Sequence, residues 1–200
     1  MKKGLLIIFS GPSGCGKGTI VQEIIKDENF CLSVSATTRQ PREGEINGVH
    51  YQFLSREEFQ SRIDSGAMLE YAQYCDNFYG TPADMVEKMR NEGKNVILEI
   101  EVQGALQVMK KCPDAVTIFV LPPSISELER RLHKRGTEAE EVIAKRIARA
   151  KEEIPLAENY KYVMMNDALE TAVSDFYAIA RAESQTYEAN KEIIGEILSC

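Results

Sequence analysis

Residues 5 to 19 read Leu5-Leu6-Ile7-Ile8-Phe9-Ser10-Gly11-Pro12-Ser13-Gly14-Cys15-Gly16-Lys17-Gly18-Thr19. The apolar start is typical of a buried strand, and Ile20, Ile24 and Ile25 follow at helical spacing. A glycine-rich turn that ends in Lys17 separates the two, which is the context of a phosphate-binding loop. Glycines let backbone N-H groups surround phosphate oxygens, while the helix N-terminus and the lysine add positive charge. The stretch therefore predicts an α/β fold that binds a nucleoside triphosphate.

The loop departs from the usual pattern at Gly18, where Ser or Thr is expected. Thr19 follows directly and can reach the phosphates or a Mg2+ ion. Cys15 is a thiol of lowered pKa or simply a small side chain at a variable position. A glycine-rich turn without a ligand is the alternative interpretation of the segment. The candidate triphosphate contacts are Gly11, Pro12, Ser13, Gly14, Cys15, Gly16, Lys17, Gly18 and Thr19.

Further runs of β-forming residues alternate with helical patterns along the chain. They are Leu32–Ser35, Val96–Ile100, Val116–Leu121 and Tyr162–Met165. Apolar strands that alternate with helices predict a parallel sheet with helices on both faces. The stretch from Leu169 to Leu198 is expected to form one long or broken amphipathic helix.

Residues 36–90 interrupt this alternation. Val49–Phe53 and Met68–Tyr74 have the pattern of short strands near polar turns. We therefore expect a small mixed-β lobe at 36–90, inserted into a core of residues 1–35 and 91–200.

Composition limits the possible partners. The chain has 200 residues, a formal net charge of -7 and a pI near 5.1, which argues against nucleic acid or an anionic membrane as the main partner. Its five cysteines are widely spaced without a metal-binding pattern, so we expect reduced thiols. No apolar run is long enough to span a bilayer and no signal-peptide pattern opens the chain, so a cytoplasmic protein is expected.

Two arginines in the lobe indicate a second anion site. Arg39 and Arg42 flank a proline-stiffened turn, and both can offer forked donors to one phosphate. A solvated Arg/Glu surface loop is the alternative for this segment.

Taken together, these motifs resemble the guanylate kinase family from the phosphate loop to about Asp167. The matching blocks are Gly11–Thr19, the Ser-x-Thr-Thr-Arg-x-Pro-Arg-x-Gly-Glu run from Ser35, Tyr79-Gly80-Thr81-Pro82, Val102-Gln103-Gly104-Ala105, Arg135-Gly136-Thr137 and Asn166-Asp167. They occur in the family's order, which is far more specific than any single motif.

The resemblance implies that the lobe binds GMP. The GMP phosphate is assigned to Arg39, Arg42, Tyr51 and Tyr79, and the guanine to Ser35, Glu70 and Thr81. Guanine presents adjacent N1-H and N2-H2 donors, which one carboxylate at Glu70 can accept, whereas adenine presents an acceptor at that edge.

Glu99 and Glu101 end a predicted buried strand and point to the same side, toward the edge where open α/β sheets bind ligands. The family usually has Asp at both positions, so the longer side chains are a departure. We expect Glu99 and Thr19 to bind a Mg2+ ion, partly through water, and Glu101 to contact GMP. A solvated strand end is the alternative for either glutamate.

A helical lid over about residues 126–157 completes the resemblance. It implies that Arg135 and Arg146 reach the triphosphate and act in catalysis with Lys17 and Arg42, because charge spreads over the γ-phosphate oxygens during transfer. Asn166 and Asp167 are expected to contact the adenine. Three neighbouring helix arginines are interpreted as solvated: Arg130, Arg131 and Arg149.

The implied reaction is ATP + GMP to ADP + GDP, with Mg2+ at the donor phosphates. Two alternatives remain open from the residues: a guanylate-kinase-like module that binds phosphorylated peptides, and a kinase for another nucleoside monophosphate. Nucleic acid and membranes are not expected partners, and the sequence leaves open whether the protein is a monomer or a homo-oligomer.

Overall fold

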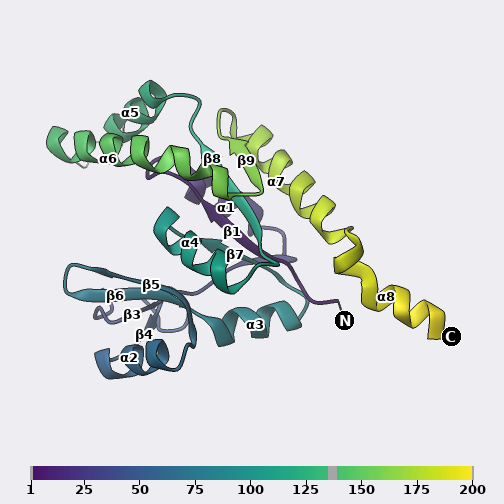
Figure 1. Cartoon of the computed structure of the whole chain (residues 1–200). Helices are drawn as coiled ribbons and strands as arrows, with labels where there is room; N and C mark the ends of the chain where they lie inside the picture. Colours follow the sequence, from purple (N-terminus) through teal and green to yellow (C-terminus); the bar gives the residue numbers. More distant parts are fainter. Residues whose placement is uncertain (1, 135–138, 200) are drawn as a thin grey trace.

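A computed structural model describes residues 2–134 and 139–199, without the side chains at positions 74, 198 and 199. Within these residues, a parallel sheet forms the centre of the molecule in the order β2-β7-β1-β8-β9 (Figure 1). Its strands are β1 (Leu6–Ser10), β2 (Phe30–Leu32), β7 (Asn95–Glu99), β8 (Val116–Leu121) and β9 (Tyr162–Met165). All five strands were predicted. The strand expected at Leu32–Ser35 lies earlier in the chain, however, and shares only Leu32 with β2. After the bond from Ser33 N to Ile97 O, the chain leaves this sheet for the lobe.

Helices cover both faces of the sheet, as predicted. Side chains alternate along β1, so Ile7 and Phe9 lie in one apolar cluster and Leu6 and Ile8 in another. The first cluster packs against α1 (Lys17–Ile24) and α7 (Leu169–Ser184), where the rings of Phe9 and Phe176 meet edge to face. The second packs against α3 (Ala83–Asn91), α4 (Val102–Lys111) and the 3-10 helix η1 (Ile154–Asn159).

The inserted lobe has its own mixed sheet in the order β4-β3-β6-β5. Its elements are β3 (Ala36–Thr37), β4 (Gln52–Phe53), α2 (Arg56–Asp64), β5 (Met68–Tyr74) and β6 (Asn77–Pro82). A separate small core of Ala36, Phe59 and Met68 holds α2 against the sheet. The predicted strand Val49–Phe53 is reduced to β4, and β6 was not predicted at all.

Contacts made by α3 and α4 join the lobe to the core. Gln107 on α4 exchanges hydrogen bonds with the backbone of Tyr71 on β5. Helix α3 lies within the range expected for the lobe, but it packs on the core sheet because Val86 is buried among Leu6 and Leu98.

The segment expected to form the lid contains α5 (Ile125–Lys134) and α6 (Glu140–Glu153), and these two helices are called the lid below. Leu128, Leu132, Ile143 and Ala150 form a small core between them. In Figure 1 the lid and the lobe lie at opposite ends of the same side of the molecule, with α4 between them.

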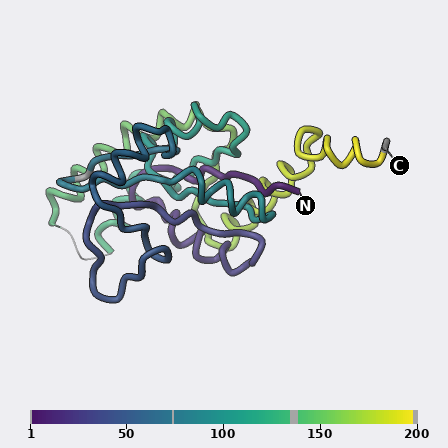
Figure 2. The backbone as a smooth tube through the Cα atoms, turned by 90° about the horizontal axis from the view of Figure 1, so that it is seen from below, coloured from purple at the N-terminus to yellow at the C-terminus, as the bar shows by residue number. Residues whose placement is uncertain are grey.

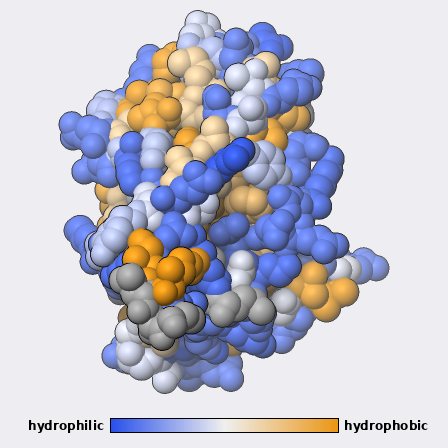
Figure 3. Space-filling model, turned by 90° about the vertical axis from the view of Figure 1, so that its right-hand side faces the viewer, coloured by the Kyte–Doolittle hydropathy of each residue, from blue (hydrophilic) through white to orange (hydrophobic). Residues whose placement is uncertain are grey.

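The C-terminal segment is broken into α7 and α8 (Tyr187–Ser199), and α8 extends beyond the rest of the molecule (Figure 2). Several large apolar side chains of α8 are exposed. Figure 3 shows hydrophobic patches on a face of the molecule that is otherwise mainly hydrophilic. No helix in the described part of the chain is both long enough and apolar enough to cross a membrane.

Candidate active site

The predicted phosphate loop lines a cavity of about 300 Å³ at the carboxyl end of β1. The loop supplies one wall, the end of β7 a second, and the lid helix α6 a third. The lining residues are Gly11, Ser13, Gly14, Gly16, Lys17, Gly18, Glu99, Ile100, Glu101, Arg146, Arg149 and Glu153. The cavity therefore collects loop N-H groups and three cations, which suits a polyphosphate.

Lys17 is held at the mouth of the loop. Its Nζ donates to the carbonyl oxygens of Gly11 (2.6 Å) and Pro12 (3.2 Å). Cys15 is fully buried below it, and burial raises the pKa of its thiol. The thiol therefore stays protonated, and Cys15 acts as a small packing side chain.

Asn166 braces the loop from the end of β9. Its Nδ2 donates to the carbonyl of Cys15 at 2.7 Å, and Arg131 donates to Asn166 O at 2.9 Å. Gly16 has φ of 96°, and a Cβ there would lie 2.3 Å from Asn166 Nδ2. Only glycine meets both conditions, so this position couples the loop conformation to β9.

A second cavity of about 470 Å³ opens on the other side of the loop. It is lined by Gly14, Gly16, Thr19, Arg131, Lys134, Asn166, Asp167 and Leu169. The structure thus places Asn166 and the exposed Asp167 together beside the loop, where the sequence expected the adenine.

The interpretation of Arg131 as a solvated helix residue was wrong. Besides Asn166 O, its guanidinium reaches the carbonyl of Cys15 at 3.3 Å and Glu127 at 2.7 Å. Arg131 follows the buried Leu128 by three residues, a spacing that puts both on one face of α5 and could have revealed the role of Arg131. Arg130 is 64% exposed and pairs with Glu127, as expected of a solvated residue.

Glu99 stands at the end of β7 opposite the start of α1. A Cβ at Gly18 would lie 3.5 Å from Glu99 Oε1, so the two are in contact distance. Partial desolvation by the surrounding protein raises the pKa of Glu99, and the positive charge of Lys17 acts in the opposite direction. Thr19 lines the other cavity, so the two residues expected to bind Mg2+ line different cavities on the two sides of the phosphate loop.

A magnesium ion still fits this donor set. Within residues 2–134 and 139–199, no cluster of three or more His, Cys, Asp or Glu side chains could hold a metal. The protein would supply the single carboxylate of Glu99, and phosphate oxygens and water the remaining ligands, which is how Mg2+ is commonly bound in phosphoryl-transfer sites.

The lobe places Arg39 among the predicted phosphate ligands. Its Cζ lies 5.5 Å from the ring centroid of Tyr51, and the ring centroids of Tyr51 and Tyr79 are 6.1 Å apart. The guanidinium forks onto both oxygens of Glu45 at 2.9 Å and lowers the pKa of Glu45 to about 2. The backbone N-H of Arg42 also donates to Glu45, while its side chain is exposed. A phosphate here has to share Arg39 with Glu45, a partner that sequence reasoning missed.

Replacing Arg39 with Ala is expected to raise the KM for the acceptor on the order of 100-fold, because a forked charge-assisted contact is lost and Glu45 is left unneutralised. The KM for the donor should change little. Arg39→Lys should remain impaired, since it restores the charge without the fork. Steady-state kinetics with each substrate varied in turn checks this, with the exposed Arg56→Ala of the same lobe as control. A loss confined to the donor would contradict the assignment.

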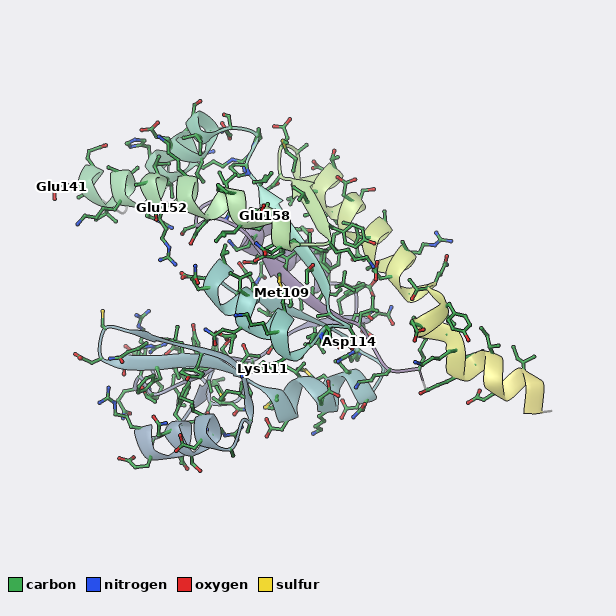
Figure 4. The ribbon with its side chains drawn as sticks, in the orientation of Figure 1. Met109, Lys111, Asp114, Glu141, Glu152 and Glu158 are labelled. Atoms are coloured by element: carbon green, nitrogen blue, oxygen red, sulfur yellow. The ribbon has the colours of Figure 1, made fainter. Side chains whose placement is uncertain are left out.

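The predicted guanine ligands Glu70 and Thr81 lie together on adjacent strands of the lobe. Thr81 Oγ1 donates to Glu70 Oε1 at 2.7 Å, and both residues are buried. Burial raises the pKa of Glu70, and the hydrogen bond from Thr81 and the charge of Lys111 partly offset this increase. Lys111, the last residue of α4, lies on the side of the molecule near the lobe (Figure 4), and its Nζ donates to Met68 O at 2.7 Å. The third predicted ligand, Ser35, precedes β3, and its carbonyl accepts from Gln52 N.

Gly104 gives Glu70 its space. A Cβ at this position of α4 would lie 2.9 Å from Glu70 Oε2. In the sequence, Gly104 stood out only as part of a motif. The close approach of Glu70 explains why this position has no side chain.

Gly104→Ala is therefore expected to push Glu70 out of place and raise the KM for the acceptor about 10-fold, the scale of a roughly 1–2 kcal/mol overpacking penalty. Gly195→Ala is the matched control, because an added Cβ there meets nothing within 4 Å. It should leave kinetics unchanged and stabilise α8 by up to about 1 kcal/mol. Kinetics and thermal melts check both, and equal KM values for the two variants would refute the steric role of Gly104.

The lid brings Arg146 to the phosphate loop, where its Nη2 donates to Ser13 Oγ at 2.7 Å. Arg149, interpreted from the sequence as a solvated helix residue, is 49% exposed and also lines the same cavity, a position that the sequence interpretation did not include. Its spacing of three residues from Arg146 puts both on one helical face, a signal that could have found it. The predicted Arg135 lies outside the described residues.

A parallel sheet with a phosphate loop after β1 and cations over that loop is the arrangement of a P-loop phosphotransferase. A family model described as "Guanylate kinase" matches residues 3–183. The guanylate kinase of Desulfitobacterium hafniense is 54% identical over 181 residues, covering 90% of each chain. That of Streptococcus thermophilus is 55% identical over 184 residues, covering 91% of this chain and 88% of its own.

Among solved structures, the crystal structure of guanylate kinase from Anaplasma phagocytophilum superposes with a TM-score of 0.67. It is 35% identical and covers 92% of this chain and 88% of its own. The chain belongs to the guanylate kinase family.

Proposed function

We propose that this protein is a guanylate kinase that transfers the γ-phosphoryl group of ATP to GMP. The observation that carries the acceptor assignment is the buried carboxylate of Glu70, fixed by Thr81 and given space by Gly104. Two adjacent guanine donors would satisfy that carboxylate, whereas adenine, with an acceptor at the same edge, would leave it unpaired. Family membership supports the same conclusion.

On the donor side, the loop N-H groups and Lys17 bind the β- and γ-phosphates. The bond from Lys17 Nζ to Gly11 O keeps the ammonium at the cavity until phosphate oxygens compete for it. Asn166 and Asp167, in the second cavity, face the base of the donor. Arg146 approaches from the lid at Ser13 and neutralises charge on the γ-phosphoryl oxygens as transfer proceeds. The same role is proposed for Arg135.

On the acceptor side, Arg39, Tyr51 and Tyr79 hold the GMP phosphate, and Arg42 adds a second guanidinium. Ser35 and Glu101 complete the proposed acceptor set. The attacking group is already an anionic phosphate oxygen, so no nucleophilic side chain is needed. Positioning, charge neutralisation and exclusion of water provide the catalysis.

Mg2+ is the proposed cofactor. When bound with the donor phosphates, it withdraws charge from the β- and γ-oxygens. Glu99 would hold it, through water or directly, and its position in the cavity lining with Lys17 and Gly18 supports this proposal. The protein groups that orient the phosphates remain the loop, Lys17 and Arg146.

Turnover of ATP with GMP, AMP, CMP and UMP tests this function. Fast transfer to GMP alone is expected. Equal or faster transfer to another monophosphate would assign a different kinase, and no transfer with phosphopeptide binding would assign a binding module.

A further inference from the structure

Arg149 bridges the lid and the core at the wall of the phosphate cavity. Its Nη2 donates to Glu101 Oε2 at 2.6 Å, across from α6 to the N-cap position of α4. Its Nε donates to Glu153 Oε1 at 2.8 Å, one turn later on its own helix. The guanidinium is thus oriented by two carboxylates while it lines the cavity that also contains Lys17.

The two carboxylates differ in how firmly they hold Arg149. The Glu153 side chain is 8% exposed, and a bond within one helix does not depend on how that helix packs against the core. The Glu101 side chain is 73% exposed, and an exposed ion pair contributes little to stability. An incoming phosphoryl group carries more charge and more acceptor oxygens than one solvated carboxylate, so it can replace Glu101 at Nη2.

We propose that Arg149 is a further catalytic residue: Glu153 keeps its guanidinium aimed into the cavity, and the phosphoryl group in transfer takes the place of Glu101. The proposal rests on the guanylate kinase function given above. In the step, a GMP phosphate oxygen bonds to Pγ while the bond from Pγ to the β,γ-bridging oxygen breaks. The ADP oxygen keeps the electron pair, and Arg149 donates hydrogen bonds to the Pγ oxygens without transferring a proton.

Arg149→Gln tests the proposal, with Lys151→Gln as the matched control. Lys151 is an exposed cation of the same helix that lines neither cavity. Arg149→Gln should lower kcat on the order of 10- to 100-fold with small changes in both KM values, as for the loss of a group acting on the transition state. Arg149→Lys should be intermediate, because it keeps the charge without the fork. Lys151→Gln should match the wild type.

A binding measurement separates contact with the phosphoryl group from a structural role. Calorimetry with ADP, GMP, Mg2+ and aluminium fluoride, a mimic of the group in transfer, should show Arg149→Gln weakened by a factor similar to its loss in kcat. Its affinity for GMP alone and its melting temperature should stay near wild type. Wild-type kcat in the folded Arg149→Gln variant, or equal weakening toward GMP alone, would overturn the proposal.

The two proposals fail in different ways. If the wild-type protein does not phosphorylate GMP, the proposed function fails whatever Arg149 does. The Arg149 comparison is then made with the monophosphate that is turned over. If GMP is turned over and Arg149→Gln is as fast as Lys151→Gln, only the inference about Arg149 fails.

Discussion

Lys17→Ala should lower kcat on the order of 10²- to 10³-fold, the scale seen when one preorganised donor at a developing oxyanion is removed. The ammonium stands at the loop mouth, bonded to Gly11 O and Pro12 O, and has little part in the core. The fold should therefore survive. ATP turnover with GMP, together with circular dichroism and a thermal melt, checks both expectations.

Lys26→Ala is the matched control, since Lys26 is an exposed lysine just beyond the same helix and pairs with Glu23 on the surface. Its kinetics should match the wild type. A folded Lys17→Ala protein with wild-type kcat would remove Lys17 from the phosphate site. A Lys17→Ala protein that does not fold would show that the lysine mainly supports the loop.

Glu70→Gln should raise the KM for GMP on the order of 100-fold, because the amide accepts one guanine donor and turns its own N-H2 toward the other. The KM for ATP should change little, since Glu70 lies on the lobe and lines neither cavity beside the phosphate loop. Steady-state kinetics measures both KM values, and calorimetric titration with GMP measures the corresponding loss of affinity. Glu57→Gln, an exposed carboxylate on α2, is the control, and equal GMP affinity of the two variants would exclude Glu70 from the guanine site.

The pH dependence of GMP binding should report on the same carboxylate. Burial raises the pKa of Glu70, so affinity for GMP should begin to fall, as the pH is lowered, at a higher pH than for an ordinary glutamate. The folded protein holds this proton more tightly than the unfolded chain. The contribution of Glu70 to the free energy of unfolding should therefore rise as the pH falls through that window. Both trends should be absent in Glu70→Gln, and a wild-type profile in that variant would assign the titration to another group.

The sequence alone determined the core of the fold. The strands β1, β7, β8 and β9 are continuous apolar runs, and the phosphate loop combines glycines, Lys17 and a following helix within a short segment. Such signals are local, because strand burial and loop conformation depend on side chains close together in the chain. The acceptor motifs could also be recognised in the sequence, but only as a set that resembles a family. Taken singly, a residue such as Glu70 or Arg39 is more often a solvated surface side chain.

The tertiary structure decided what depends on residues far apart in the sequence. β3 is only two residues long, and it exists because Ala36 and Thr37 pair with Gly80 and Tyr79. β6 escaped prediction because its sequence, NFYGTP, contains Gly, Pro and Asn, which are rare in strands, and its pairing with β5 and β3 overrides that preference. The steric need for Gly104 depends on Glu70, and the positions of Arg131 and Arg149 depend on Asn166 and Glu101. Helix periodicity puts these arginines on a face of α5 or α6, but only the packing of the lid over the sheet decides whether that face meets solvent or the site.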